Sequence, residues 1–145
     1  MTDRNALPSP PATGRRDLDL AHLRLQSSME DLWRALERGT REEAMTCTVG
    51  LLAGLRADYT GEESLMRRSA YPDLDNHLEA HATLESGFVA LVRRIRDGGP
   101  DLGPADRDAL RAVLRRLAGD LAAHVRGADC ALARFLDSAG VPDRA

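Results

Sequence analysis

Hydrophobic residues recur every three or four positions along most of the chain, a spacing typical of amphipathic helices. Glycine and proline mark the ends of these stretches, with Gly39 after the first and Pro142 after the last. Thr40 and Glu43 have the spacing of a capping box at the start of the second stretch. The pattern predicts four helices, over about residues 18–38, 40–69, 74–97 and 104–137.

Short connections join these four stretches, so consecutive helices are expected to run antiparallel. Aromatic residues make up only 3% of the chain and runs of β-branched residues are absent, which argues against a sheet. The expected fold is therefore all-α, an up-down-up-down antiparallel four-helix bundle over residues 17–139. The Pro-rich polar residues 1–16 predict a disordered or extended leader, and residues 140–145 form a short tail.

Composition excludes several classes of function. The net charge of −3 offers no basic surplus for binding nucleic acid. No apolar run approaches the ~18–20 residues of a membrane span, so no membrane association is expected. Cys47 and Cys130 lack the spacing of a redox or zinc motif. A reducing cytoplasm is the expected location, and the sequence does not specify an oligomeric state.

All four histidines fall on the apolar stripes that are expected to face inward. A single histidine there is usually a core residue hydrogen-bonded to a carbonyl or carboxylate. Here the inward positions also carry acids, and buried carboxylates cost several kcal/mol unless they are paired or bind metal. A metal site is therefore favoured. The candidate ligands are His22, Asp58, Glu62, His77, His81, His124 and Asp129.

Seven candidate ligands exceed the four of a tetrahedral zinc site and suit two octahedral ions of the iron or manganese type. His77 and His81 lie one helical turn apart, as do Asp58 and Glu62, so each pair can face a shared centre.

Four segments in this order resemble the hemerythrins, specifically the single-domain bacterial hemerythrins: LDLAHLRL, YTGEESLM, YPDLDNHLEAHATL and HVRGAD, within residues 18–136. The resemblance implies two iron ions joined by an oxo or hydroxo group. One iron would be bound by three histidines and the other by His22 and Asp58, with Glu62 and Asp129 bridging both. The three histidines would be His77, His81 and His124. In that family, O2 binds at the iron with fewer protein ligands.

The spacing of the last two ligands predicts an irregular helix. His124 and Asp129 are five residues apart, which on an ideal α-helix points their side chains ~140° away from each other. Both can reach one centre only if the helix widens or kinks between them, and Gly127 lies at that place. Widened π-turns of this kind occur frequently at functional sites.

The chain departs from the family pattern at four positions around the expected site. DYTGEE places Asp58 where the family has histidine and Tyr59 where it has phenylalanine. Gln26 stands one turn after the first histidine, where phenylalanine is usual, and Asp120 stands where tryptophan is frequent. A carboxylate ligand favours the ferric state or manganese, and extra protic groups can donate protons. We therefore expect a protein that activates or consumes O2 or peroxide.

Alternatives remain open for each of these residues. If Asp58 turns away from the metal, the site is that of an ordinary O2-binding, storage or sensing hemerythrin. Tyr59 can be a core ring whose hydroxyl lies at the edge of the site. Gln26 and Asp120 either reach the site or lie at its rim in solvent, and Glu63 is expected to be solvated or to contact a ligand. Enzymatic turnover and the identity of any other small-molecule substrate therefore stay undecided.

Overall fold

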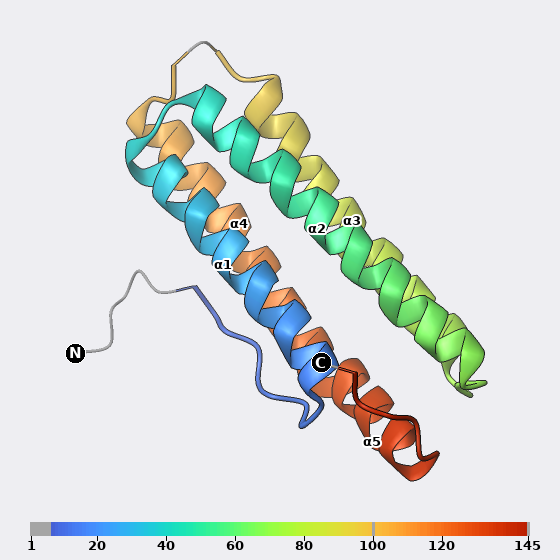
Figure 1. Ribbon diagram of the computed structural model, residues 1–145. Helices are drawn as coiled ribbons and strands as arrows, with labels where there is room; N and C mark the ends of the chain where they lie inside the picture. The colour runs from blue at the N-terminus through green and yellow to red at the C-terminus, as the bar shows by residue number, and fades with distance from the viewer. Residues whose placement is uncertain (1–6, 100, 145) are drawn as a thin grey trace.

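The computed structural model describes residues 7–99 and 101–144, and within them the chain forms a four-helix bundle (Figure 1). Each helix packs against its neighbours in sequence, and the first also packs against the last. The all-α prediction is confirmed. The elements are α1 (Arg16–Arg38), α2 (Arg41–Arg68), α3 (Leu74–Arg96), α4 (Pro104–His124), the π-helical turn η1 (Val125–Asp129) and α5 (Cys130–Ser138).

The connection between α1 and α2 is as short as the sequence predicts, and its capping box is confirmed. The Glu43 backbone N–H donates to Thr40 Oγ1 at 3.1 Å, and the Thr40 N–H donates to Glu43 Oε2 at 3.0 Å. Gly39 is required at the preceding turn because a Cβ there would lie 2.9 Å from the carbonyl oxygen of Ala35. These contacts fix where α2 turns back along α1.

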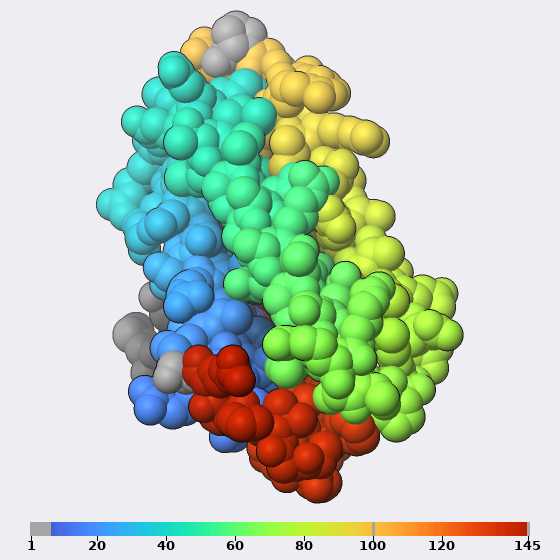
Figure 2. All heavy atoms as spheres, turned by 45° about the vertical axis from the view of Figure 1, so that its right-hand side comes forward, coloured from blue at the N-terminus to red at the C-terminus, as the bar shows by residue number. Residues whose placement is uncertain are grey.

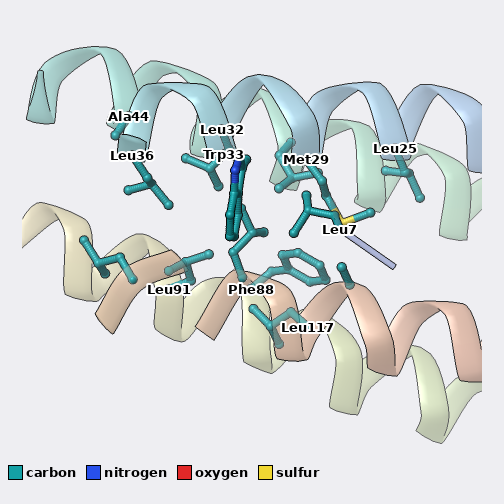
Figure 3. Close-up of a cluster of buried hydrophobic side chains, with 14 of the residues drawn as sticks. Leu7, Leu25, Met29, Leu32, Trp33, Leu36, Ala44, Phe88, Leu91 and Leu117 are labelled. Carbon is teal, nitrogen blue, oxygen red and sulfur yellow. The ribbon is translucent and has the colours of Figure 1, made fainter. Parts of the chain in front are cut away.

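Two hydrophobic clusters fill the interior. The larger occupies most of the bundle, and Figure 3 shows Leu32, Trp33 and Leu36 of α1 facing Phe88 and Leu91 of α3. The smaller cluster lies at the opposite end and joins the start of α1 to the end of α2, the connection after it, and α5. Its buried members are Leu18, Met66, Tyr71, Leu132, Ala133 and Leu136.

A layer of buried polar side chains separates the two clusters. On α1, His22 lies between Leu18 of the smaller cluster and Leu25 of the larger one. On α2, Glu62 lies between Tyr59 and Met66 in the same way. The bundle therefore has an apolar interior on both sides of one polar layer.

The segments before α1 and after α5, residues 7–15 and 139–144, both pack on the bundle. Residues 7–15 form no helix, yet Leu7 is buried in the larger cluster and Arg15 is only 1% exposed. Of the two possibilities for the leader, the extended one therefore holds for residues 7–15. This segment is ordered by burying Leu7 and by the hydrogen bonds of Arg15. Residues 1–6 of the predicted disordered leader lie outside the described residues.

The C-terminal tail folds back beside the start of α1 (Figure 1). Gly140 turns the chain with a φ of +69°, which glycine adopts without strain. Arg15 donates to the carbonyl oxygens of Val141 and Pro142, both at 3.0 Å. The Asp143 carboxylate accepts hydrogen bonds from the backbone N–H groups of Arg16 and Asp17 at 2.7 and 2.9 Å. The tail is thus tied across the N-terminus of α1.

Within the described ranges, no helix combines the length and the apolar character needed to cross a membrane.

Candidate metal centre

The predicted irregularity in the last helix is confirmed. Val125–Asp129 forms a π-helical turn, and this wider turn brings His124 and Asp129 onto the same inward face. His124 Nε2 lies 3.0 Å from Asp129 Oδ1. A Cβ at Gly127 would meet nothing within 4 Å, so the turn does not depend on glycine for space. The backbone itself therefore places two residues that are five positions apart on one face of the helix.

Five side chains from α2, α3 and the last helix converge in the polar layer. Each offers one nitrogen or oxygen atom, and these atoms all lie within 4.8 Å of one another. Glu62 Oε1 lies 2.7 Å from His77 Nε2 and 3.2 Å from His81 Nε2. Asp129 Oδ1 lies 3.1 Å from His77 Nε2. We refer to Glu62, His77, His81, His124 and Asp129 as the five-ligand group.

The spacing of the five-ligand group fits one metal ion. Transition metals bind nitrogen and oxygen at about 2.1 Å, so neighbouring atoms of an octahedral shell lie about 3 Å apart and opposite atoms about 4.2 Å. The separations of 2.7 to 3.2 Å match neighbouring positions of this shell, and the 4.8 Å span is slightly wider than its opposite positions. Five protein ligands leave one position of an octahedron for another ligand.

Two buried atoms of the group support the same interpretation. Asp129 Oδ1 and His124 Nε2 are 3.0 Å apart, yet neither has a hydrogen bond of acceptable geometry. Buried polar atoms almost always have a partner, and an unpaired one is costly. Lone pairs that lie close together without pointing at each other are what a shared cation requires. A metal ion would satisfy both atoms.

The other oxygen of Asp129 faces a different element. His22 Nε2 on α1 is hydrogen-bonded to Asp129 Oδ2 at 2.9 Å, so the two carboxylate oxygens serve opposite sides of the layer. His22 is buried and its Nδ1 atom has no hydrogen-bond partner. His22 is thus connected to the five-ligand group through Asp129.

Asp58 lies at the edge of the layer. It is half-buried and has no hydrogen bond or ion pair within the described residues. Burial raises the pKa of its carboxyl group, while the positive charges of Arg24 and His22 act in the opposite direction. Asp58 therefore lies near His22 and remains outside the five-ligand group.

The charges of the polar layer favour protonated imidazoles. Burial alone would lower the pKa of His77, but its contacts with Asp129 and Glu62 outweigh burial and raise the pKa to about 9. Likewise, burial alone would raise the pKa of Asp129, yet His124, His22 and His77 hold it well below its usual range. The pKa of His22 is also raised against burial, by Asp129. A binding cation must therefore compete with protons at His22 and His77.

Three further side chains contact the ligand histidines. Glu63 Oε1 lies 3.0 Å from His81 Nδ1, so it can fix the ring orientation from outside the group. The Tyr59 ring stacks on the His81 ring with centroids 3.7 Å apart, and its buried hydroxyl has no partner. Tyr71, which the sequence analysis did not single out, meets His77 edge-on at 6.1 Å. Tyr71 lies in the break between α2 and α3, and this position is the feature of the sequence that could have identified it.

The two remaining candidates from the sequence have different surroundings. Gln26 is buried, and its Nε2 donates to Glu30 Oε1 at 3.3 Å, while its Oε1 has no partner. It makes no hydrogen bond to the five-ligand group. Asp120 is exposed on α4, which matches the alternative that this residue lies in solvent. The polarity that Asp120 adds therefore does not reach the interior.

A pocket of about 380 Å³ opens beside the polar layer, between α1, α2 and the C-terminal tail. Glu62 and Asp58 line it, which gives this side of the layer access from solvent. Figure 2 shows the tail against both α1 and α2 where the three meet. This pocket could not be predicted from the sequence, because one of its walls is the folded-back tail.

Neither models of protein families, nor curated proteins, nor solved structures match this chain, so the site is interpreted from its own residues and geometry.

Proposed function

We propose that the protein is a hemerythrin-like non-haem di-iron protein that binds O2 or peroxide and consumes it. Manganese could replace iron in the same ligand set. The observation that carries the proposal is the position of Asp129, whose two oxygens face separate groups of histidines. Such a carboxylate suits two neighbouring cations, each with its own imidazole ligands.

The residues divide into two sides. We assign the first ion to His77, His81 and His124, with one oxygen each from Glu62 and Asp129. A second ion would be held by His22 and the other oxygen of Asp129, with the nearby Asp58 as a further candidate ligand. When bound, the pair of ions supplies electrons to a small oxidant.

The surroundings of His22 and Asp58, where the second ion would bind, favour a protein that consumes O2 or peroxide over one that stores O2. Reversible binding needs a dry, apolar pocket that keeps protons away from the bound molecule. Here the pocket beside Glu62 is open to solvent and also contains Asp58. Burial raises the pKa of Asp58, and its carboxyl group lines the same pocket as Glu62, so it is a candidate to transfer protons there. Water and protons can therefore reach the place where O2 or peroxide would bind.

Reversible O2 binding is the second candidate, and one observation favours it. Asp58 lies outside the five-ligand group and makes no hydrogen bond to His22 or Asp129. If Asp58 stays there when metal binds, it leaves one position open on the second ion. The site would then hold O2 without the effect of an added carboxylate ligand.

The two candidates differ in how the protein behaves in air. The protein is loaded with Fe(II) without oxygen, exposed to air, and followed by absorption spectroscopy through repeated reduction and re-oxygenation. The proposal predicts rapid conversion to the ferric state with loss of O2 or peroxide from solution. A stable oxygenated spectrum that is reversed by removing O2 would overturn it.

Asp58→His tests the residue that separates the two candidates. We expect the variant to hold O2 longer than the unmodified protein, because a neutral imidazole replaces an acid beside His22. Asp120→His is the matched control, because Asp120 is exposed on α4. An unchanged oxygen lifetime in Asp58→His would show that Asp58 does not determine the outcome.

A further inference from the structure

The pocket beside the polar layer has chemically different ends. Asp58, Glu62, Leu65 and Arg68 follow one another along the face of α2 that lines it, at intervals of three or four residues. At 1.5 Å per residue, Glu62 and Arg68 are separated by about 9 Å along the helix axis. The pocket thus leads from the edge of the candidate metal centre to a basic end.

The basic end carries two arginines that have no ionic partner among the described residues. Arg68 and Arg144 line the pocket, and neither forms an ion pair within the described residues. Arg68 donates only to the backbone oxygen of Ser64, at 3.3 Å. The acid at this end, Asp17, is held by both Nε and Nη2 of the buried Arg15, at 3.2 and 2.9 Å. An anion added at this end would therefore meet two guanidinium groups, while Asp17, the acid that lines this end, is already held by Arg15.

The middle of the pocket is apolar. Leu18 and Ala21 of α1, Leu65 of α2 and Val141 of the tail give it apolar walls, while Ala57 and Arg24 line the pocket at the end beside Asp58. A volume of about 380 Å³ is near the lower end of the range for small-molecule sites. An apolar wall of this size fits a short hydrocarbon chain and offers nothing to an inorganic anion.

Two sets of hydrogen bonds fix the tail, and with it Arg144, at the pocket. Asp143 accepts from the N-terminal N–H groups of α1, and Arg15 donates to the carbonyl oxygens of the tail. The wall is thus built by hydrogen bonds that involve a buried arginine, only 1% exposed, and a helix N-terminus. These hydrogen bonds within the protein set the position of this wall.

We propose that this pocket binds a small aliphatic carboxylic acid, with its carboxylate at Arg68 and Arg144 and its hydrocarbon chain over Leu18 and Leu65. The far end of the chain reaches Glu62, beside the candidate metal centre. One part of this proposal rests on the proposed function, namely that the bound acid is the molecule presented to the metal centre. The binding itself depends only on the pocket residues.

Hexanoate is the probe, because its chain is short enough to lie between Arg68 and Glu62. Isothermal titration calorimetry on the iron-loaded protein is expected to show saturable binding of hexanoate. Hexanamide, which has the same shape without the charge, and inorganic phosphate, which has charge without a chain, are each expected to bind at least about tenfold more weakly. Equal binding of hexanamide or of phosphate would contradict the proposed ligand class.

The double variant Arg68→Gln/Arg144→Gln tests the basic end. We expect it to weaken hexanoate binding about tenfold or more, because both charge-assisted contacts are lost. The matched control is Arg67→Gln/Arg94→Gln, which removes the same charge from two exposed positions outside the pocket. Unchanged affinity in Arg68→Gln/Arg144→Gln, or an equal loss in the control, would overturn the assignment.

Gly61→Leu tests the space. Gly61 lines the pocket in the middle of α2, and a Cβ there would meet nothing within 4 Å, so leucine can enter without disturbing the helix. Gly50 has the same open surroundings on α2 away from the pocket, and Gly50→Leu is the control. We expect hexanoate binding to be lost in Gly61→Leu and kept in Gly50→Leu. Retained binding in Gly61→Leu would show that hexanoate binds elsewhere.

The same titration on metal-free protein separates this proposal from the proposed function. The arginines and the apolar wall belong to the chain, so hexanoate is expected to bind without iron as well. If the protein binds no metal but binds hexanoate with the predicted response to the variants, the proposed function fails and the pocket stands. If iron binds but hexanoate does not, only the pocket proposal fails.

Discussion

The two sides of the polar layer differ in how firmly they are enclosed. The side formed by α3 and by the continuous helix α4–η1–α5 holds three histidines, which are packed between the two hydrophobic clusters. Their ring centroids lie 4.6 to 5.2 Å apart. The side formed by α1 and α2 has His22, Asp58 and an open pocket. Packing thus fixes the geometry of the first side, while the second side is accessible to a small molecule.

The departures from the hemerythrin-like pattern are divided between these regions in a way that the sequence could not show. Asp58 lies on the open side, where a change of ligand can alter reactivity without disturbing the core. Tyr59 stacks on His81 of the enclosed side, where its ring contributes to packing. The enclosed side is therefore held by packing, and the open side is the one that a small molecule can reach.

Asp129→Asn is expected to have the largest effect, because Asp129 joins the two sides. The amide keeps the shape but loses the charge that faces three histidines, and breaking a buried pair costs about 3–5 kcal/mol. We expect metal content to fall to one ion per chain or fewer, measured by elemental analysis, and the free energy of unfolding of the metal-free protein to fall by that amount in urea. Asp120→Asn is the exposed control. Two ions retained in Asp129→Asn would contradict the bridging role.

His22→Gln and His81→Gln compare the two sides directly. His22→Gln removes a ligand from the open side, so we expect one ion per chain to remain, held by the five-ligand group. His81→Gln removes a ligand from that group and is expected to weaken the remaining ion of the enclosed side. Metal titration with a competing chelator measures both affinities. If His22→Gln lost both ions while His81→Gln kept both, the assignment of the sides would be reversed.

The pH dependence of the metal-free protein sharpens the account of the enclosed side. The pKa of His77 is raised from 6.5 to about 9 in the folded protein, so its protonated form is stabilised by folding. This contribution is fully present below pH 6.5 and is lost as the pH rises through 9. We expect the free energy of unfolding, measured in urea with chelator present, to fall across this window. His77→Gln should flatten the decline, and an equally steep decline in His77→Gln would contradict it.

Tyr59→Phe is expected to have the smallest effect on stability. The Tyr59 hydroxyl is buried and has no hydrogen-bond partner, while the stacked ring is kept in phenylalanine. Removing an unpaired buried polar group is neutral or stabilising by about 1 kcal/mol. Thermal unfolding of the metal-free protein measures the change. A loss of stability well beyond 1 kcal/mol would show that the hydroxyl has a stabilising partner.

The features predicted from the sequence are those with a local or periodic cause. Helical periodicity gave the four helices, and the Thr40 and Glu43 spacing gave the capping box. The π-turn was predictable because His124 and Asp129 can face one centre only if the helix widens. These inferences needed no knowledge of how distant segments pack.

The features that the sequence could not predict depend on contacts between its ends. The tail reaches the pocket because Arg15 and Asp143 tie residues more than a hundred positions apart, and neither has a periodic signal. The exposure of Asp120 and the burial of Gln26 depend on small rotations of α4 and α1, which a helical stripe does not resolve. Contact of Glu63 with His81 likewise follows from the register between α2 and α3.

The most direct test of the central claim is a crystal structure of the iron-loaded protein with an anomalous difference map at the iron edge. The account predicts two anomalous peaks on opposite sides of the Asp129 carboxylate, one among His77, His81 and His124 and the other beside His22. A single peak, or imidazoles that remain hydrogen-bonded to the carboxylates with no peak between them, would contradict a paired-ion centre.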